Sequence, residues 1–142
     1  MKLLVSVALL LAATLAIPSA QQKAAGPMDA YKAYLAVLAN AKSLDELIPH
    51  YTKELGGLLG KMPKDQQANY LKMNKRTLKD LKVTSETVDD NKAVYMMTAT
   101  DNGRPASGKV TLVKEGGAWK IDDDAWATST GGDDGELISR LP

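Results

Sequence analysis

The fold is decided by the stretch from Lys92 to Asp122, which reads KAVYMMTATDNGRPASGKVTLVKEGGAWKID. Apolar and polar side chains alternate at its start, as in a strand with one buried face. Asp101-Asn102-Gly103 supplies residues that tolerate a positive φ angle, and Glu115-Gly116-Gly117 does so again. The stretch therefore predicts two hairpins that join strands over 92–100, 107–113 and 118–122, with 123–126 as an extension of the last strand.

Upstream, residues 82–88 are rich in Val and Thr and end at the turn residues Asp89-Asp90-Asn91, which predicts one more strand. Before Leu81 the apolar period is helical. Pro27 suits the first turn of a helix over 28–41, and Ser43 with Glu46 forms a capping box. We expect a short turn there, a helix from near Pro49 to Gly56-Gly57 or Gly60, and a third helix from Pro63 to Leu81. Helices followed by an antiparallel meander indicate the α+β class.

The N-terminus has the composition of a secretory signal peptide. Lys2 precedes an apolar run, and small residues follow at Ser19 and Ala20. The run is shorter than the roughly 20 residues that span a bilayer, although an uncleaved anchor is the alternative. We expect residues 1–20 as signal peptide, 21–26 as linker, 27–126 as the domain and 127–142 as a flexible acidic tail. The predicted location is the periplasm or outside the cell, with no stable membrane span after processing.

Charge and composition exclude several classes of protein. The 142 residues carry a net charge of +1 and no cysteine, so disulfides and lipid attachment at an export signal are excluded. Basic residues prevail over 27–82 and acidic residues over 83–142. Because these charges nearly balance, we expect no nucleic-acid partner.

The chain resembles the small exported proteins of the nuclear-transport-factor-2-like superfamily, close to the group with lumazine-binding-like domains. The resemblance rests on Tyr31 and Tyr34 in the first helix, on the stretch from Ser43 to Pro49, and most of all on the strand, Gly turn and Trp-Lys-Ile-Asp strand over 110–123. It implies N-terminal helices packed on a curved four-stranded antiparallel sheet, a cone-like pocket and homodimers. Because the superfamily includes isomerases, dehydratases, binding proteins and adaptors, it indicates the fold more than the function.

A pocket for a small apolar or aromatic ligand is the first candidate site. Methionine adapts to irregular ligands, and aromatic side chains supply large contact surfaces. Plain core packing or a dimer interface is the alternative for the same side chains. The predicted lining is Tyr31, Tyr34, Tyr95, Met97, Val110 and Trp119.

A basic helix face is the second candidate site. Lys72, Lys75, Arg76 and Lys79 follow the spacing i, i+3, i+4, i+7, so a continuous third helix would present them on one side. This face would dock an anionic partner such as lipid headgroups, an acidic polymer or the acidic tail of another copy. The alternative is the solvated side of an amphipathic helix.

The sequence gives little support for a metal site or for a catalytic nucleophile. His50 is the only histidine, so an ordinary zinc site is excluded. The run Asp122-Asp123-Asp124 lacks the alternate spacing of a calcium loop, and consecutive strand residues point to opposite faces. No nucleophile elbow or phosphate-binding loop is present. We therefore expect no catalytic residue, metal or cofactor.

We expect an exported, non-catalytic binding or interaction domain. The first alternative is an isomerase or hydrolase that uses acid–base chemistry, for which a buried carboxylate facing a tyrosine would be the diagnostic feature. Asp122 comes closest to such a position. The second alternative is a purely structural envelope protein whose own side chains fill the pocket.

Overall fold

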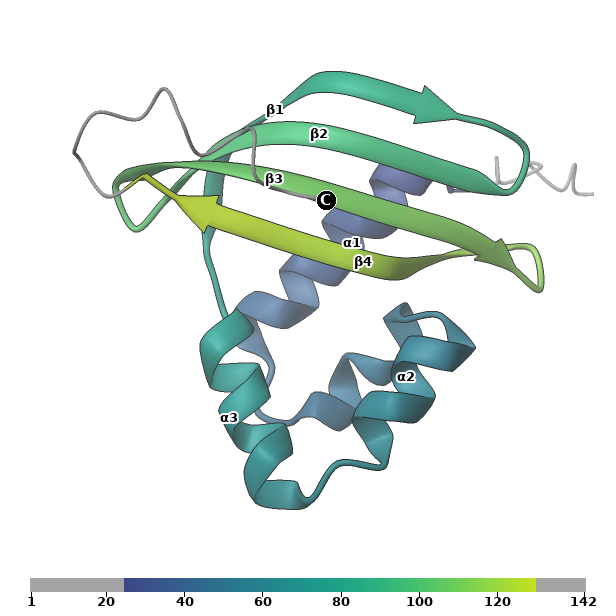
Figure 1. Ribbon diagram of the computed structural model, residues 1–142, viewed down its shortest axis with the longest axis vertical. Helices are drawn as coiled ribbons and strands as arrows, with labels where there is room; N and C mark the ends of the chain where they lie inside the picture. The colour runs from purple at the N-terminus through teal and green to yellow at the C-terminus, as the bar shows by residue number, and fades with distance from the viewer. Residues whose placement is uncertain (1–24, 130–142) are drawn as a thin grey trace, which may run out of the picture.

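The computed structural model describes residues 25–129 (Figure 1). The predicted signal peptide, most of the linker and the tail beyond Ser129 lie outside these residues. In chain order the elements are the helix α1 (Pro27–Asn40), the 3₁₀ turns η1 (Leu44–Glu46) and η2 (Ile48–His50), the helices α2 (Lys53–Gly60) and α3 (Lys64–Asn74), and the strands β1 (Leu78–Val88), β2 (Lys92–Asp101), β3 (Arg104–Glu115) and β4 (Ala118–Thr128).

The four strands form one open antiparallel sheet in the order β1-β2-β3-β4. Both predicted hairpins are confirmed. Asn102 and Gly103 have φ angles of 50° and 79°, and Gly116 and Gly117 have 57° and 80°, the left-handed values that these turns require. The predicted α+β class and four-stranded antiparallel sheet are therefore confirmed.

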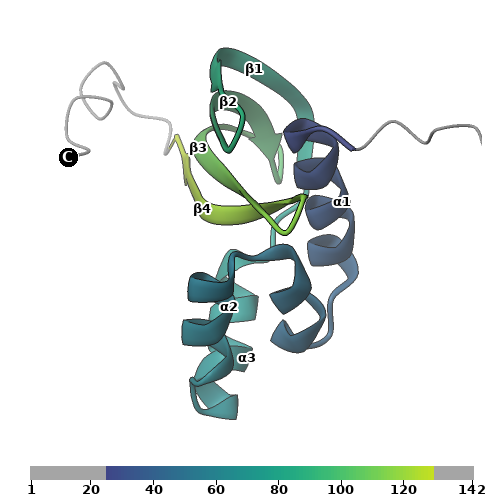
Figure 2. The same ribbon diagram turned by 90° about the vertical axis from the view of Figure 1, so that its right-hand side faces the viewer.

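The helix α1 covers one face of the sheet (Figure 2). Tyr31, Tyr34 and Leu38 recur at helical spacing and are buried in the same core as the sheet residues. Figure 2 shows α2 and α3 farther down, beside the β4 side of the sheet, and no described helix against the opposite face. No helix within residues 25–129 is long and apolar enough to cross a membrane.

Polar side chains set the ends of the short helices. Half of the predicted capping box of Ser43 and Glu46 forms, since Glu46 Oε1 accepts from the Ser43 amide at 3.1 Å while the Glu46 amide donates to the Ser43 carbonyl, and it starts a single 3₁₀ turn. The helix α2 begins at Lys53 rather than near Pro49, because Thr52 accepts a hydrogen bond from the Leu55 amide and caps it. At the other end, buried Gln67 donates to the carbonyls of Gly60 and Met62.

The predicted ends of the third helix and of the last strand are also wrong. The third helix ends at Asn74, and residues from Leu78 onward belong to β1, because Leu78 and Lys79 pair with Asp101 and Thr100 of β2. At the C-terminal side, β4 extends to Thr128, past the predicted boundary at residue 126. In both places long-range strand pairing overrides the local pattern.

Candidate functional site

A β-bulge in β4 turns a carboxylate into the protein. Leu112 pairs with Ile121, but Thr111 pairs with Asp123, so one extra residue lies in β4 between the two pairs. This shift reverses the alternation of side chains beyond it. Asp124 consequently lies opposite buried Val110, on the α1 face of the sheet. Its side chain is only 6% exposed.

Asp124 is the centre of a cluster that we call the polar junction, formed by Tyr31, Arg76, Asp124 and Trp126. The Tyr31 hydroxyl donates to Asp124 Oδ1 at 3.0 Å. Trp126 Nε1 donates to the same Oδ1 at 3.0 Å and to the Tyr31 oxygen at 2.9 Å. The junction therefore joins α1 to β4 through the two hydrogen bonds of the Tyr31 hydroxyl, and the third hydrogen bond lies within β4.

Arg76 brings the segment between α3 and β1 into the polar junction. Its Nη1 lies 4.0 Å from Asp124 Oδ1, and its side chain is 10% exposed. Its Nε and Nη2 donate to Asn74 O and Oδ1. Arg76 Nη1 and Asp124 Oδ2 are both buried without a hydrogen-bond partner among the described residues. Such a pair is the kind of site that an ordered water commonly bridges.

Gly108 leaves room for the ring of Trp126. These two residues are paired across β3 and β4, and the ring lies directly over the Gly108 backbone, so that a Cβ atom there would overlap it. The glycine is thus required by a close approach, which is a common reason for glycine inside a strand.

Tyrosines extend the cluster away from Asp124. Tyr34 stacks on Tyr31 with ring centroids 6.0 Å apart, and its hydroxyl lies 3.1 Å from that of Tyr51. Burial, followed by the Asp124 charge, raises the pKa of both Tyr31 and Tyr34. Burial likewise raises the pKa of Tyr51. All three therefore stay protonated at neutral pH and act as hydrogen-bonding groups.

The residues of the predicted ligand pocket lie in the hydrophobic core. Tyr31, Tyr34, Tyr95, Met97 and Val110 are all at most 3% exposed. Trp119 is half-buried and packs against the same core, with Lys114 Nζ 5.7 Å from its ring centroid. The structure brings these side chains together as core. Their role in binding a ligand stays a prediction.

The predicted basic helix face does not form, because α3 ends at Asn74. Lys72 lies in the last turn of α3, whereas Lys79 lies in β1. Lys75 Nζ donates to the Ala41 carbonyl at 2.9 Å, and Arg76 belongs to the polar junction. The four basic residues therefore do not share one helix surface.

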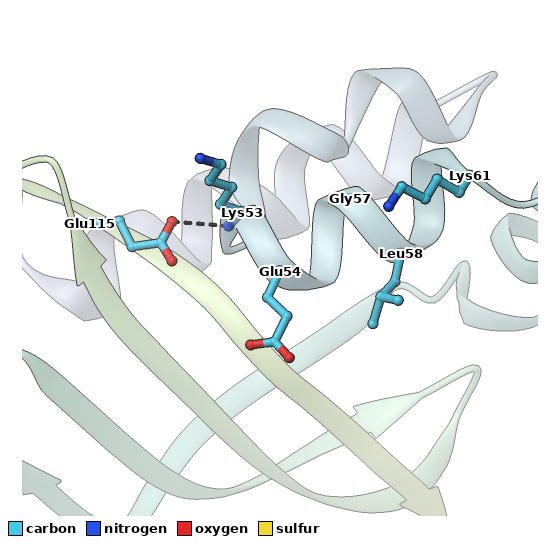
Figure 3. Close-up of a pocket in the computed structure, with 6 residues that line it drawn as sticks. All are labelled: Lys53, Glu54, Gly57, Leu58, Lys61 and Glu115. Carbon is cyan, nitrogen blue, oxygen red and sulfur yellow. Dashed lines mark hydrogen bonds between the residues drawn. The ribbon is translucent and has the colours of Figure 1, made fainter.

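A groove of about 510 Å³ lies between α2 and the end of β3 (Figure 3). Glu115 closes one end, where its Oε2 accepts from the Lys53 amide at 2.9 Å. Leu58 is 62% exposed and points from α2 in the same direction as Glu54. The groove is lined by Lys53, Glu54, Gly57, Leu58, Lys61 and Glu115. It thus combines one apolar side chain with charges of both signs.

Within residues 25–129, no cluster of three or more histidine and acidic side chains is placed to hold a metal ion. His50 is half-buried beside the Tyr34 ring, with centroids 6.1 Å apart. Burial, with a smaller contribution from Lys120, lowers its pKa. Asp122, the predicted candidate for an inward carboxylate, is exposed and accepts from the Thr52 hydroxyl at 3.3 Å. Asp124 takes the inward position instead.

No known family model matches the chain, and no curated protein matches it. Among solved structures, it is similar to the solution structure of RPA3114, a SEC-C motif containing protein from Rhodopseudomonas palustris. The TM-score is 0.52 at 17% sequence identity, over 72% of this chain and 79% of RPA3114. At this identity the likeness concerns the fold alone.

This likeness overturns the resemblance to the nuclear-transport-factor-2-like superfamily, since RPA3114 has a different fold. The stretch over 110–123 that carried the resemblance encodes a strand, a Gly turn and a strand. Many antiparallel sheets need such a hairpin, so its sequence does not identify a superfamily. The chain is an α+β protein whose fold resembles that of RPA3114.

Proposed function

We propose that this protein is an exported, non-catalytic interaction domain whose protein partner contacts the groove beside α2. The observation that carries the proposal is the exposed Leu58 between charges of both signs. An apolar anchor with a polar rim is the usual composition of a protein interface. A partner segment with one apolar side chain, an acidic group facing Lys61 and a basic group facing Glu54 would fit this surface.

Binding of a small apolar ligand in the core is a less favoured alternative to a protein partner at the groove. The predicted lining is already packed, so a ligand would have to displace side chains such as Tyr95 or Met97. The proposal of a core ligand also includes the cone-like pocket and the homodimer that were expected from the sequence. A reproducible small-molecule mass in native mass spectrometry would support the core ligand and count against a protein partner.

Acid–base catalysis is a second candidate, favoured by the contact between Asp124 and Tyr31. That contact is the diagnostic pair of a buried carboxylate and a tyrosine. However, the Tyr31 hydroxyl both donates to Asp124 and accepts from Trp126, which leaves little capacity for a substrate. We therefore favour a structural role for the polar junction.

Capture of partners from an extract of the source organism tests the main proposal. Bait carrying Leu58→Asp should lose a partner that the wild-type bait retains. Met73→Asp is the matched control, because Met73 is 84% exposed on α3. Both changes are at the surface, so unfolding free energies should stay within about 0.5 kcal/mol of wild type. If both baits retain every partner of the wild-type protein, the groove is not the interface.

A further inference from the structure

The face of the sheet opposite α1 is basic and rich in hydroxyl groups. The register places Lys79 beside Thr100, Lys82 beside Thr98, and Lys109 beside Met96. Thr98 and Thr100 alternate with buried Met97 and Ala99, so these pairs point away from the core. We call this surface the open face and define it by Lys79, Lys82, Thr98, Thr100, Ser107 and Lys109.

Exposed Asp123, two residues from the Ala125 partner of Lys109, lies on the same side of the sheet, but the three lysines leave the open face with a net positive charge within the described part of the chain. Its three lysines are exposed, and none forms an ion pair with another residue of 25–129. At one end it contains a hollow of about 390 Å³, which is lined by Thr77, Lys79, Thr100, Asn102 and Gly103. Lysine, hydroxyl and amide groups are suitable donors to carboxylates.

The chain leaves the sheet at the same end as this hollow. Thr128 pairs with Ala106, and the Ser129 amide donates to the Pro105 carbonyl at 2.9 Å. Pro105 pairs with Thr100, which pairs with Lys79. The end of β4 is thus three strand spacings from β1, or roughly 14 Å. Four extended residues span roughly 13 Å, so the chain is long enough for Asp133 and the residues after it to reach Lys79.

We propose that the acidic segment from Asp133 to Glu136 docks on the open face of its own chain. Residues 130–142 hold three acidic groups, Asp133, Asp134 and Glu136, and one basic group, Arg140. Their charge is therefore opposite to that of the three lysines. Because exposed ion pairs are individually weak and screened by salt, the contact depends on ionic strength.

A spin label on the C-terminal segment tests this docking directly. The protein contains no cysteine, so Ser139→Cys gives a single labelling site. In low salt, amide signals of Lys79, Lys82 and Thr100 should be lost through proximity to the label, while those of α2 persist. High salt should restore the lost signals, as should the combined variant Asp133→Asn, Asp134→Asn and Glu136→Gln.

Lysine variants show which surface holds the segment. Lys79→Gln with Lys82→Gln should restore the signals of the open face, whereas Lys53→Gln with Lys61→Gln at the groove should not. The proposal is overturned if the open face keeps its signals in low salt, or if both lysine pairs act alike. A mixture of labelled chain and isotope-enriched unlabelled chain detects docking between copies. Loss of signal in that mixture equal to that within one chain would also overturn docking in the same chain.

Discussion

Replacing Gly108 by alanine should disrupt the polar junction, because β3 and the Trp126 ring approach each other closely there. The new Cβ atom would overlap Trp126 Cδ2 and Cε2 and would lie 2.8 Å from Cε3. To reach ordinary contact, the ring has to move by roughly 1 Å. Trp126 Nε1 now lies 2.9 Å from the Tyr31 oxygen and 3.0 Å from Asp124 Oδ1, so such a movement stretches at least one of these hydrogen bonds.

The expected loss follows from these two effects. Overpacking a filled site costs about 1–3 kcal/mol, and a buried hydrogen bond to a charged group contributes about 1.5–3 kcal/mol. Alanine recovers up to about 1 kcal/mol, because it loses less backbone entropy than glycine in a strand. We therefore expect Gly108→Ala to lower the free energy of unfolding by about 3 kcal/mol.

Urea unfolding followed by far-ultraviolet circular dichroism measures this loss in a double-mutant cycle with Trp126→Ala. Without the indole ring, Gly108→Ala should change stability by less than about 1 kcal/mol. Gly57→Ala is the control, because a Cβ atom at Gly57 meets nothing within 4 Å. The reasoning is refuted if Gly108→Ala costs less than about 0.5 kcal/mol, or if it costs the same in both backgrounds.

Three further changes probe the same interior. Asp124→Ala should cost about 3 kcal/mol in urea unfolding, because it leaves the Arg76 guanidinium buried without a counter-charge, and the double variant with Arg76→Met should be more stable than Asp124→Ala alone. Gln67→Met should cost about 1–3 kcal/mol by leaving two carbonyls without a donor, whereas Gln66→Met at an exposed position should change little. Burial raises the pKa of Tyr34 above its ordinary 10.0. The protonated hydroxyl therefore makes its full contribution to the free energy of unfolding below pH 10, and this contribution is lost as the pH rises further. Unfolding between pH 9 and 11.5 should therefore show a slope that Tyr34→Phe reduces by up to about 1.4 kcal/mol per pH unit, and an unchanged slope would contradict the assignment.

Local patterns predict the elements of this fold well where a turn or a cap marks their ends. Asn102-Gly103 and Gly116-Gly117 need positive φ angles, and both hairpins occur at these residues. Pro27 opens α1 as expected. These features depend on a few neighbouring residues, so a single sequence is sufficient to place them.

Features that depend on pairing between distant residues could not be predicted in the same way. Leu78 fits the helical line of Gln67, Leu71 and Asn74, yet it pairs with Asp101 in the sheet. Strand pairing and core packing decide whether Leu78 continues the helix or joins the sheet, and neither can be read from the spacing of apolar residues in the local sequence. The predicted basic helix face was wrong for this reason. That Lys79, Lys82 and Lys109 share one face of the sheet could be recognised only from the register of the strands.

The same limit explains why Asp124 was not recognised from the sequence, in which Asp122 came closest to the position of an inward carboxylate. In the run Asp122-Asp123-Asp124, strict alternation from buried Ile121 would place Asp123 inward and Asp124 outward. The bulge between the Leu112 and Thr111 pairs shifts this phase by one, so Asp124 and Trp126 point inward. Because the bulge aligns Trp126 with Gly108 and Asp124 with Tyr31 and Arg76, it joins β4 to α1 and to the segment before β1. Because Tyr31 and Trp126 both donate to Oδ1 of this carboxylate, we favour a structural role for it and direct the search for a partner to the surface beside Leu58.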